Sequence, residues 1–303
     1  MSEKGIPVSA GYGKHEETTS SPVGEHKSLL LDKALLAIKT AKQVKNWPTV
    51  LSQYACSRVS SRLSPAEIRF AFRDGTRMTC GGDSYATFPV FEVLIGDTYR
   101  LSVLAPLLPD APLGLVDVGA HVGSATVALS RRLHLRAAVC AEPSPTSVAR
   151  LRLNLGANRL EAKVVEAAVG AVAGSAVLDE RIAGSGENQA RVFNGDPNSA
   201  EPGATGGRLV PMVPFADLLA SVGPGPSVVK MDCEGGEYAI VGGTASSAWS
   251  DVVAVLLEYH PVAGEGGWPW LRERLGDAGL QPLWHRPDQS RPGQGTVCLV
   301  RKS

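Results

Sequence analysis

The sequence lacks the features that mark nucleic-acid-binding and membrane proteins. Lys plus Arg and Asp plus Glu both number 30, so the formal net charge at pH 7 is zero, and the positive surplus of a nucleic-acid binder is absent. No apolar run approaches the length that spans a bilayer, and residues 1–21 contain no apolar signal-peptide core. We therefore expect a cytoplasmic protein that binds neither nucleic acid nor membranes.

The cysteines are few and poorly placed for disulfides or structural zinc. There are five, an odd number, and none is spaced as CxxC. Three of them lie in apolar runs, where cysteine behaves as a small hydrophobic residue. Two arginine-rich segments, 57–64 and 131–136, are expected to form solvated helix faces.

What the sequence does contain is enough apolar residues, 44% of 303, for a substantial core. Residues 1–25 are polar and without period, which predicts a disordered tail. An N-terminal subdomain is expected over 26–104. It would comprise a helix from His26 to about Trp47, a hairpin over 68–80 turning at Asp74-Gly75, and a helical segment over 86–104 broken near Gly96.

From residue 105 to the end, short β-branched runs alternate with helical segments. The expected strands are 113–119, 137–143, 162–170, 227–232 and 252–260, and the expected helices are 124–133, 144–158, 213–222 and 268–279. Segments 281–287 and 296–302 close the chain, and a Gly-rich stretch, 184–207, interrupts the order. Ser144 and Pro145 suit the cap and first position of a helix. The alternation predicts an α/β domain with a mostly parallel sheet and helices on both faces.

Acidic residues recur where the predicted strands end. Asp117, Glu142 and Glu166 end the first three, Lys230, Asp232 and Glu234 follow the fourth, and Glu258 and His260 end the fifth. Ligands of open α/β sheets bind at the carboxyl ends of the strands. We therefore expect these side chains to face a ligand-binding cleft, and a cleft rich in carboxylates favours a cationic ligand.

The first strand, helix and second strand form a candidate nucleoside-binding unit. The turn DVGAHVG offers only Gly119 and Gly123, short of the GxGxxG dinucleotide fingerprint. Glu142 ends the next strand 23 residues after Gly119, where a carboxylate can accept both ribose hydroxyls. Carboxylates repel a pyrophosphate, so S-adenosylmethionine, with its sulfonium and ammonium groups, fits this unit better than NAD does.

Five segments together resemble a known family. They are DVGAHVGSATVALS, AEPSPTSVARLRLNLGANRL, AAVG at 167–170, VVKMDCEGGEYAIVGG and LLEYHP, and they span about 113–261. Their order and spacing resemble the FkbM-like S-adenosylmethionine-dependent methyltransferases. The resemblance implies a class I methyltransferase fold, Rossmann-like, whose seven-stranded sheet has an antiparallel last strand, here TVCLVRK. It also implies O-methylation, less often N-methylation, of sugars, polyketides and other small molecules.

The resemblance also implies roles for individual residues. Gly119, His121 and Gly123 would form the turn under the methionine end of the cofactor, and Glu142 would bind the ribose. The segment Glu166, Ala167 and Ala168 would lie beside the adenine, and Asp232 nearest the reacting methyl group. Asp117, Ser124 and Pro143 complete the implied cofactor-binding set.

Methyl transfer also needs a group that removes a proton from the acceptor. Asp232 is the first candidate base and His260 the second, with Glu258 on the same strand face as His260. Glu237 begins a helix, where its charge suits the dipole. A Mg²⁺ site formed by Asp232, Glu234 and Glu258 stays open.

Several alternatives stay open at this point. They are an N-methyltransferase, a nicotinamide-dependent oxidoreductase, and a binding module that keeps the fold without turnover. The Ala/Gly/Arg-rich texture of 100–303 is typical of high-GC bacterial genomes, which suggests a hypothesis of natural-product or antibiotic biosynthesis. The sequence does not fix the small-molecule acceptor or the oligomeric state, and a homodimer is one option.

Overall fold

The computed structural model describes residues 34–179, 189–192 and 207–302. The expected tail over 1–25 and most of the Gly-rich stretch 184–207 lie outside these ranges. Within them, no helix is both long enough and apolar enough to cross a membrane.

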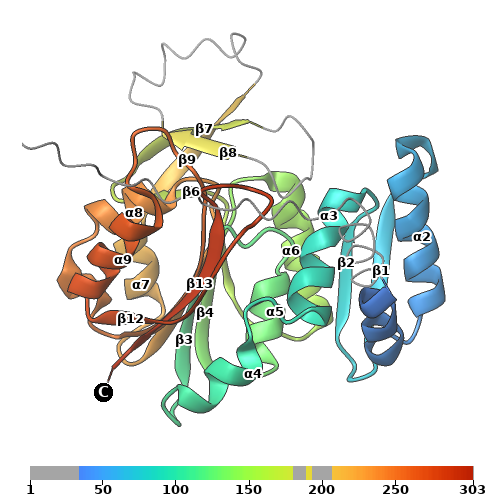
Figure 1. Ribbon diagram of the computed structural model, residues 1–303, viewed down its shortest axis with the longest axis horizontal. Coiled ribbons are helices and arrows are strands. Elements are labelled where there is room, and N and C mark those ends of the chain that lie inside the picture. The colour runs from blue at the N-terminus through green and yellow to red at the C-terminus, as the bar shows by residue number, and fades with distance from the viewer. Residues whose placement is uncertain (1–33, 180–188, 193–206, 303) are drawn as a thin grey trace, which may run out of the picture.

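The centre of the molecule is a seven-stranded sheet in the order β12-β13-β11-β10-β3-β4-β5 (Figure 1). Its strands are β3 (Leu113–Val118), β4 (Leu135–Ala141), β5 (Lys163–Val165), β10 (Ser227–Met231), β11 (Val252–Tyr259), β12 (Leu280–Pro287) and β13 (Gly295–Arg301). Strands β3, β4, β5, β10 and β11 pair in parallel, and β13 runs antiparallel to both β11 and β12. The predicted class I methyltransferase fold, including its antiparallel last strand, is confirmed.

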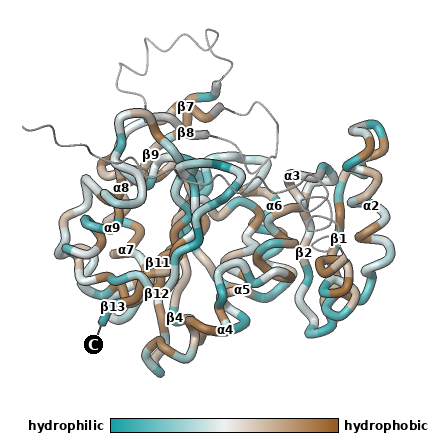
Figure 2. Tube along the Cα trace, in the orientation of Figure 1, coloured by the Kyte–Doolittle hydropathy of each residue, from teal (hydrophilic) through white to brown (hydrophobic). Residues whose placement is uncertain are grey.

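Helices cover both faces of this sheet because its strands are apolar on both sides. On one face, Leu115 and Leu256 pack in a cluster with α5 (Ser124–Ser130). On the other, Val116 and Leu257 pack in a second cluster with α7 (Phe215–Ser221), α8 (Glu237–Gly243) and α9 (Gly267–Asp277). The apolar strands form a hydrophobic centre in the tube view (Figure 2). Helix α6 (Pro145–Ala157) buries Leu151 beside β4.

The N-terminal elements pack on the α5 side of the sheet (Figure 1). They are a helix over 34–43, α2 (Trp47–Val59), η1 (Ser61–Leu63), the hairpin β1 (Glu67–Ala71) and β2 (Arg77–Gly81), α3 (Ser84–Pro89), the π-helix η2 (Val90–Ile95), α4 (Leu101–Leu104) and η3 (Ala105–Leu107). The hairpin and the break near Gly96 are confirmed. The subdomain boundary at residue 104 stays a prediction.

Asn154 of α6 fastens the hairpin to the main domain. Its buried amide accepts the Thr79 backbone N–H at 2.7 Å and donates to the Thr79 carbonyl at 2.9 Å and the Val122 carbonyl at 2.8 Å. Buried polar groups that are fully paired hold two segments in one arrangement. The N-terminal elements therefore have a fixed position beside the carboxyl ends of the strands.

Three local expectations were wrong. The strand expected over 162–170 is two, because the chain turns at Glu166 from β5 into β6 (Ala168–Gly170). Strand β6 belongs to a second sheet, β6-β9-β7-β8, with β7 (Gly174–Asp179), β8 (Gln189–Val192) and β9 (Arg208–Pro214). The helix expected from His26 to about Trp47 ends at residue 43, since Val44 bridges to Phe72.

The third error concerns residues 131–136, which are not a helix face. Helix α5 ends at Ser130, and β4 begins at Leu135. Arg136, near the start of β4, donates hydrogen bonds to the carbonyls of Gly223, Gly225 and Pro226, which precede β10. A guanidinium has five N–H donors, so it can satisfy several carbonyls at once.

Candidate active site

The site is built where β3 and β10 end side by side. Asp117 and Lys230 are opposite each other in the register of these strands. Gly119 follows β3 with φ +70°, and a Cβ atom added there would lie 1.8 Å from the carbonyl oxygen of Asp232. Only glycine allows this crossing of the two chain segments. The turn after β3 and the acidic turn after β10 are therefore in direct contact.

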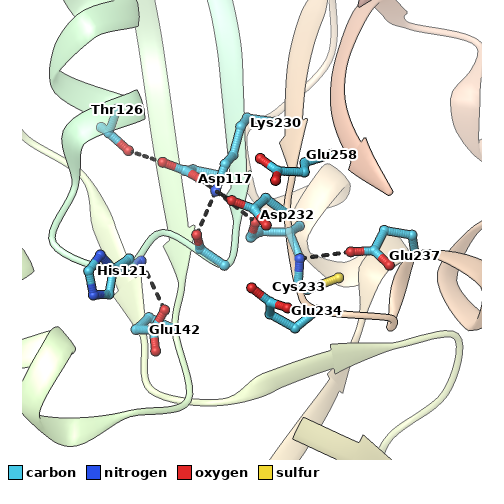
Figure 3. A network of polar contacts seen from close by, with 12 residues as sticks. Asp117, His121, Thr126, Glu142, Lys230, Asp232, Cys233, Glu234, Glu237 and Glu258 are labelled. Carbon is cyan, nitrogen blue, oxygen red and sulfur yellow. Dashed lines mark hydrogen bonds and ion pairs between the residues drawn. The ribbon is translucent and has the colours of Figure 1, made fainter. Parts of the chain in front are cut away.

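A buried charged network lies beneath this crossing (Figure 3). Asp117 accepts a 2.5 Å hydrogen bond from Thr126 Oγ1, and its other oxygen lies 3.4 Å from Lys230 Nζ. Lys230 also donates to the Gly119 carbonyl at 2.6 Å and lies 3.7 Å from Asp232. Burial alone would lower the pKa of Lys230, but the charges of Asp117 and Asp232 raise it above its ordinary value. Lys230 therefore stays charged.

Glu142, at the end of β4, faces the turn after β3 (Figure 3). One carboxylate oxygen accepts the His121 backbone N–H at 2.9 Å, and the other accepts the Ser144 N–H at 2.9 Å. Burial raises the pKa of Glu142 to about 7, although these hydrogen bonds oppose the shift. A carboxylate that accepts two N–H groups still has lone pairs for ligand hydroxyl groups.

A cavity of about 130 Å³ lies over these groups. Of the predicted cofactor-binding residues, those that line it are Gly119, His121, Ser124, Glu142, Pro143, Ala167, Ala168 and Asp232. Asp117, Gly123 and Glu166 are not among the lining residues. Asp117 is fully buried beneath the cavity, and Glu166 is exposed to solvent. Gly123 precedes α5 as its N-cap residue, with φ +87°.

A second charged group lies at the ends of β10 and β11, and its centre is His260. His260 Nδ1 lies 3.2 Å from Glu237 Oε1. On the other side of the ring, Nε2 lies 3.5 Å from Glu234 Oε2 and 3.9 Å from Glu258 Oε1. The imidazole is therefore surrounded by carboxylates on both sides.

These neighbours control the protonation of the group. Burial would lower the pKa of His260, but the hydrogen bond and charge of Glu237 and the charges of Asp232 and Glu234 raise it to about 10. Burial raises the pKa of Glu234 and of Glu258 to about 7, and the charge of Asp232 adds to both shifts. The surrounding carboxylates thus favour the protonated form of the His260 imidazole. The role of His260 as a catalytic base stays a prediction.

A larger cavity of about 600 Å³ adjoins the first. Its walls come mainly from the N-terminal helices, and they are Leu36, Ala37, Leu51, Tyr54, Ala55, Arg58, Tyr85 and Phe88, with Arg291 and Gln294 from the loop before β13. Five residues line both cavities, namely Pro89, Glu92, Asp232, Glu234 and Glu258. Four of these five are acidic, so the two cavities meet at a ring of carboxylates.

The contribution of the N-terminal elements to this site was not predicted from the sequence. Glu92 is the one charged residue of the π-helix VFEVLI, whose other five residues are buried. Burial raises the pKa of Glu92 to about 7, with a further contribution from Glu258. A lone acid in an apolar helical run was the available signal, and π-helices are frequent at functional sites. Thr98, Tyr99, Val169, Ala176 and Met212 also line the smaller cavity without having been predicted.

The oxygen ligands proposed for Mg²⁺ are grouped differently in the structure. Among the described residues, Asp232, Glu234 and His260 each place one ligand atom within 4.8 Å of the others. Glu258 is not part of this set. The sequence could not show this, because His260 enters the group only through the pairing of β10 with β11.

Comparison with known proteins identifies the family. The family model described as the methyltransferase FkbM domain matches residues 117–283, more than half of the chain. No protein of curated function matches the chain.

Solved structures with a similar fold include several methyltransferases. Magnesium protoporphyrin IX methyltransferase from Synechocystis PCC 6803 with bound SAM is 13% identical, with 70% of this chain and 84% of that chain covered and a TM-score of 0.39. The SAM-dependent methyltransferase from Agrobacterium tumefaciens is 7% identical, with 78% and 70% covered and a TM-score of 0.43. The ribosomal protein L11 methylase from Lactobacillus delbrueckii subsp. bulgaricus is 13% identical, with 68% and 80% covered and a TM-score of 0.36. These likenesses are too distant to bear on the acceptor.

The family match covers the turn after β3, the end of β4 and the acidic turn after β10, which are the segments that build the smaller cavity. Because this family is one of methyltransferases, the match excludes the alternative function of a nicotinamide-dependent oxidoreductase. The chain belongs to the FkbM methyltransferase family, and it is an S-adenosylmethionine-dependent methyltransferase.

Proposed function

We propose that the enzyme O-methylates a hydroxyl group of an apolar small molecule. The donor would bind in the smaller cavity and the acceptor in the larger one. The observation that carries this proposal is the junction of the two cavities at Glu92, Asp232, Glu234 and Glu258. A methyl donor and an acceptor in adjoining cavities meet at a defined place, which is the first requirement of an in-line displacement.

The residues of the smaller cavity fit the donor chemically. S-adenosylmethionine supplies a methyl group on a positively charged sulfur. Glu142 offers a carboxylate to the ribose hydroxyls, and Ala167, Ala168 and Met212 offer an apolar surface to the adenine. Asp232 places negative charge where the sulfonium and ammonium groups need it. These assignments keep the cofactor-binding roles expected for Glu142, Ala167, Ala168 and Asp232.

The acceptor proton needs a carboxylate that faces both cavities. Asp232 and Glu258 do so, with side chains 29% and 26% exposed. We assign Glu258 as the proton acceptor and Asp232 as the residue that orients the acceptor beside the methyl group. We assign His260 as a positioning residue, because its Nε2 lies 3.5 Å from Glu234 and 3.9 Å from Glu258.

The charge of the junction favours a hydroxyl over an amine as the acceptor. Carboxylates near an amine raise its pKa and keep it protonated, and a protonated amine has no lone pair with which to attack a methyl group. A hydroxyl has no charge to stabilise, and a nearby carboxylate can remove its proton. The apolar walls of the larger cavity, including Leu51, Tyr54 and Phe88, suit an acceptor with an apolar body. Such a body occurs in many natural products, so the hypothesis of natural-product biosynthesis stays a proposal.

Transfer of a labelled methyl group tests this proposal. Apolar acceptors of one skeleton would be offered with a hydroxyl, an amine or a methoxy group at the same position, and the product would be identified by mass spectrometry and NMR. We expect methylation of the hydroxyl compound alone. Preferential methylation of the amine would overturn the assignment of the acceptor atom.

Filling the larger cavity tests where the acceptor binds. Ala37→Trp and Ala55→Trp would each place a large ring among its lining residues. We expect both to lower transfer to the acceptor and to leave the binding of S-adenosylhomocysteine unchanged. Ala157→Trp, at the exposed end of α6, is the matched control. Unchanged transfer in both cavity variants would show that the acceptor binds elsewhere.

A further inference from the structure

Three side chains at the junction of the cavities form a mixed nitrogen and oxygen ligand set. The ligand atoms of Asp232, Glu234 and His260 all lie within 4.8 Å of one another. Asp232 and Glu234 come from the turn after β10, and His260 comes from the end of β11. The two carboxylates line both cavities. An ion held by this set would therefore touch the space where donor and acceptor meet.

The imidazole of His260 is held in the orientation that a metal ligand needs. Nδ1 lies 3.2 Å from Oε1 of Glu237, a fully buried carboxylate that also accepts the backbone N–H groups of Cys233 at 3.0 Å and Gly235 at 2.9 Å. A carboxylate behind one ring nitrogen fixes the ring and directs the other nitrogen toward the metal in protein metal sites. Glu237 fixes the ring here in the same way, which leaves Nε2 facing Glu234.

Negative charge converges at this place. Asp232, Glu234, Glu237 and Glu258 lie around a single imidazole. Lys230, 3.7 Å from Asp232, is shared with Asp117 and with backbone carbonyls, and Glu258 accepts a hydrogen bond from Gln294 at 2.9 Å. Partly buried carboxylates are costly unless a cation balances them. A divalent cation would supply this balance at the point where the carboxylates converge.

We propose that Asp232, Glu234 and His260 bind a divalent cation, with Glu237 as the residue that positions His260. Two carboxylates and one imidazole suit Mn²⁺ or a similar first-row ion better than Ca²⁺, which takes oxygen ligands. The ion would take the place of the proton on Nε2 of His260, which is released to solvent, while Nδ1 keeps its proton toward Glu237. Three protein ligands leave coordination positions free for water or for an acceptor hydroxyl. A hydroxyl bound to such an ion loses its proton more readily. In the proposed reaction that proton passes to Glu258. Only this last step rests on the proposed function.

Metal binding can be measured without an acceptor. The full-length protein, freed of metal by a chelator, would be titrated with Mn²⁺ alone, followed by calorimetry and by the loss of the free Mn²⁺ signal in electron paramagnetic resonance. We expect one Mn²⁺ per chain, in the presence and in the absence of S-adenosylhomocysteine. Pulsed measurements should detect magnetic coupling of Mn²⁺ to the nitrogen of His260. Ca²⁺ should compete weakly.

Variants decide whether these residues hold the ion. His260→Gln should abolish the nitrogen coupling, and Glu234→Gln should weaken Mn²⁺ binding. Glu237→Gln leaves all three ligands in place and should weaken it by about ten- to a hundred-fold through the loss of orientation. Glu265→Gln, an exposed acid beyond β11, is the matched control. Circular dichroism and S-adenosylhomocysteine binding would confirm that each variant is folded.

The two proposals can fail separately. Absence of Mn²⁺ binding, or binding that His260→Gln, Glu234→Gln and Glu237→Gln all retain, would overturn the metal site and leave the transfer of methyl groups to a hydroxyl untouched. Binding of Mn²⁺ without nitrogen coupling would also overturn it, because the ion would then sit on surface carboxylates. Methyl transfer only to an amine would overturn the proposed acceptor and leave the metal site standing.

Discussion

Two sets of charged residues lie at the carboxyl end of the same sheet, and they differ in how the protein balances their negative charge. Asp117 is fully buried, and its charge is matched by Lys230 on the neighbouring strand and by the hydroxyl of Thr126. Asp232 and Glu234 follow Lys230 by two and four residues, and their side chains are 29% and 19% exposed. They line both cavities. The first group is closed off inside the protein, whereas the second shares Lys230 and His260 as its cationic partners and remains open to the cavities.

This difference distinguishes carboxylates that stabilise the fold from carboxylates that can bind a ligand. A carboxylate such as Asp117, fully buried beside a lysine in register and not lining the cavity, cannot reach a ligand. A carboxylate that lines a cavity with raised pKa, as Glu234 and Glu142 do, is destabilised until a ligand arrives. An acidic residue at a strand end therefore indicates function only when its charge is not neutralised by the fold.

Breaking the matched pair should have the largest effect on folding. Lys230→Met leaves Asp117 buried with Thr126 as its remaining side-chain partner, and removal of one member of a buried ion pair typically costs about 3–5 kcal/mol. We expect a loss of this size in the free energy of unfolding, measured by urea denaturation. The double variant Asp117→Asn/Lys230→Met should be more stable than Lys230→Met alone. A loss below about 1 kcal/mol for Lys230→Met would contradict the matched pair.

The crossing that brings the two groups together is the next point to test. Gly119→Ala places a methyl group 1.8 Å from the Asp232 carbonyl oxygen and forces a residue with a side chain to keep φ near +70°. The backbone conformation alone costs of order 1–3 kcal/mol, and the overlap must displace the turn after β10. We expect lower stability together with weaker binding of S-adenosylhomocysteine in calorimetry. The exposed Gly156 of α6, where an added Cβ meets no atom within 4 Å, is the control position for Gly→Ala. Normal binding by Gly119→Ala would show that the crossing can relax.

The sequence predicted the order of the sheet and the edge where the smaller cavity lies, because both depend on local patterns. Alternating apolar strands and helices fix the order of a class I sheet, and the carboxyl ends of its strands are where Asp117, Glu142 and Asp232 had to lie. Distinguishing Asp117 from Asp232 was beyond the sequence. That distinction depends on the register of β3 against β10, which puts Lys230 beside Asp117.

The parts that sequence analysis missed depend on contacts between distant segments. Glu92 reaches the junction of the cavities because the N-terminal elements pack beside the strand ends, through contacts such as Asn154 with Thr79. The turn from β5 into β6 was hidden for a similar reason, since residues 162–170 read as one continuous strand. His260 was expected as the second candidate base, and only its neighbours, among them Glu237 and Glu234, show that its pKa is raised.

Removing a functional carboxylate should affect the ligand more than the fold. Glu142→Ala deletes the group assigned to the ribose hydroxyls, and hydrogen bonds to a charged group are worth about 1.5–3 kcal/mol each. We expect the affinity for S-adenosylhomocysteine to fall by roughly ten- to a hundred-fold or more in calorimetry. Glu166→Ala is the matched control, since Glu166 is exposed and does not line the cavity. An equal loss in both variants would restore Glu166 to the adenine side of the site.

The smallest expected effect is the pH dependence of cofactor binding. The pKa of Glu142 is about 7 in the free protein, mainly because of burial, and its ionised form is the better acceptor for two ribose hydroxyls. Binding therefore favours the deprotonated state, so the affinity for S-adenosylhomocysteine should rise with pH through about 7, by at most about ten-fold per pH unit.

Glu92, Glu234 and Glu258 have pKa values of about 7 as well, so the wild type must be compared with Glu142→Gln. The difference between the two profiles between about pH 6 and 8 isolates Glu142. Identical profiles would mean that Glu142 keeps one protonation state between about pH 6 and 8. Its contacts within the protein would then fix its charge before the ligand binds.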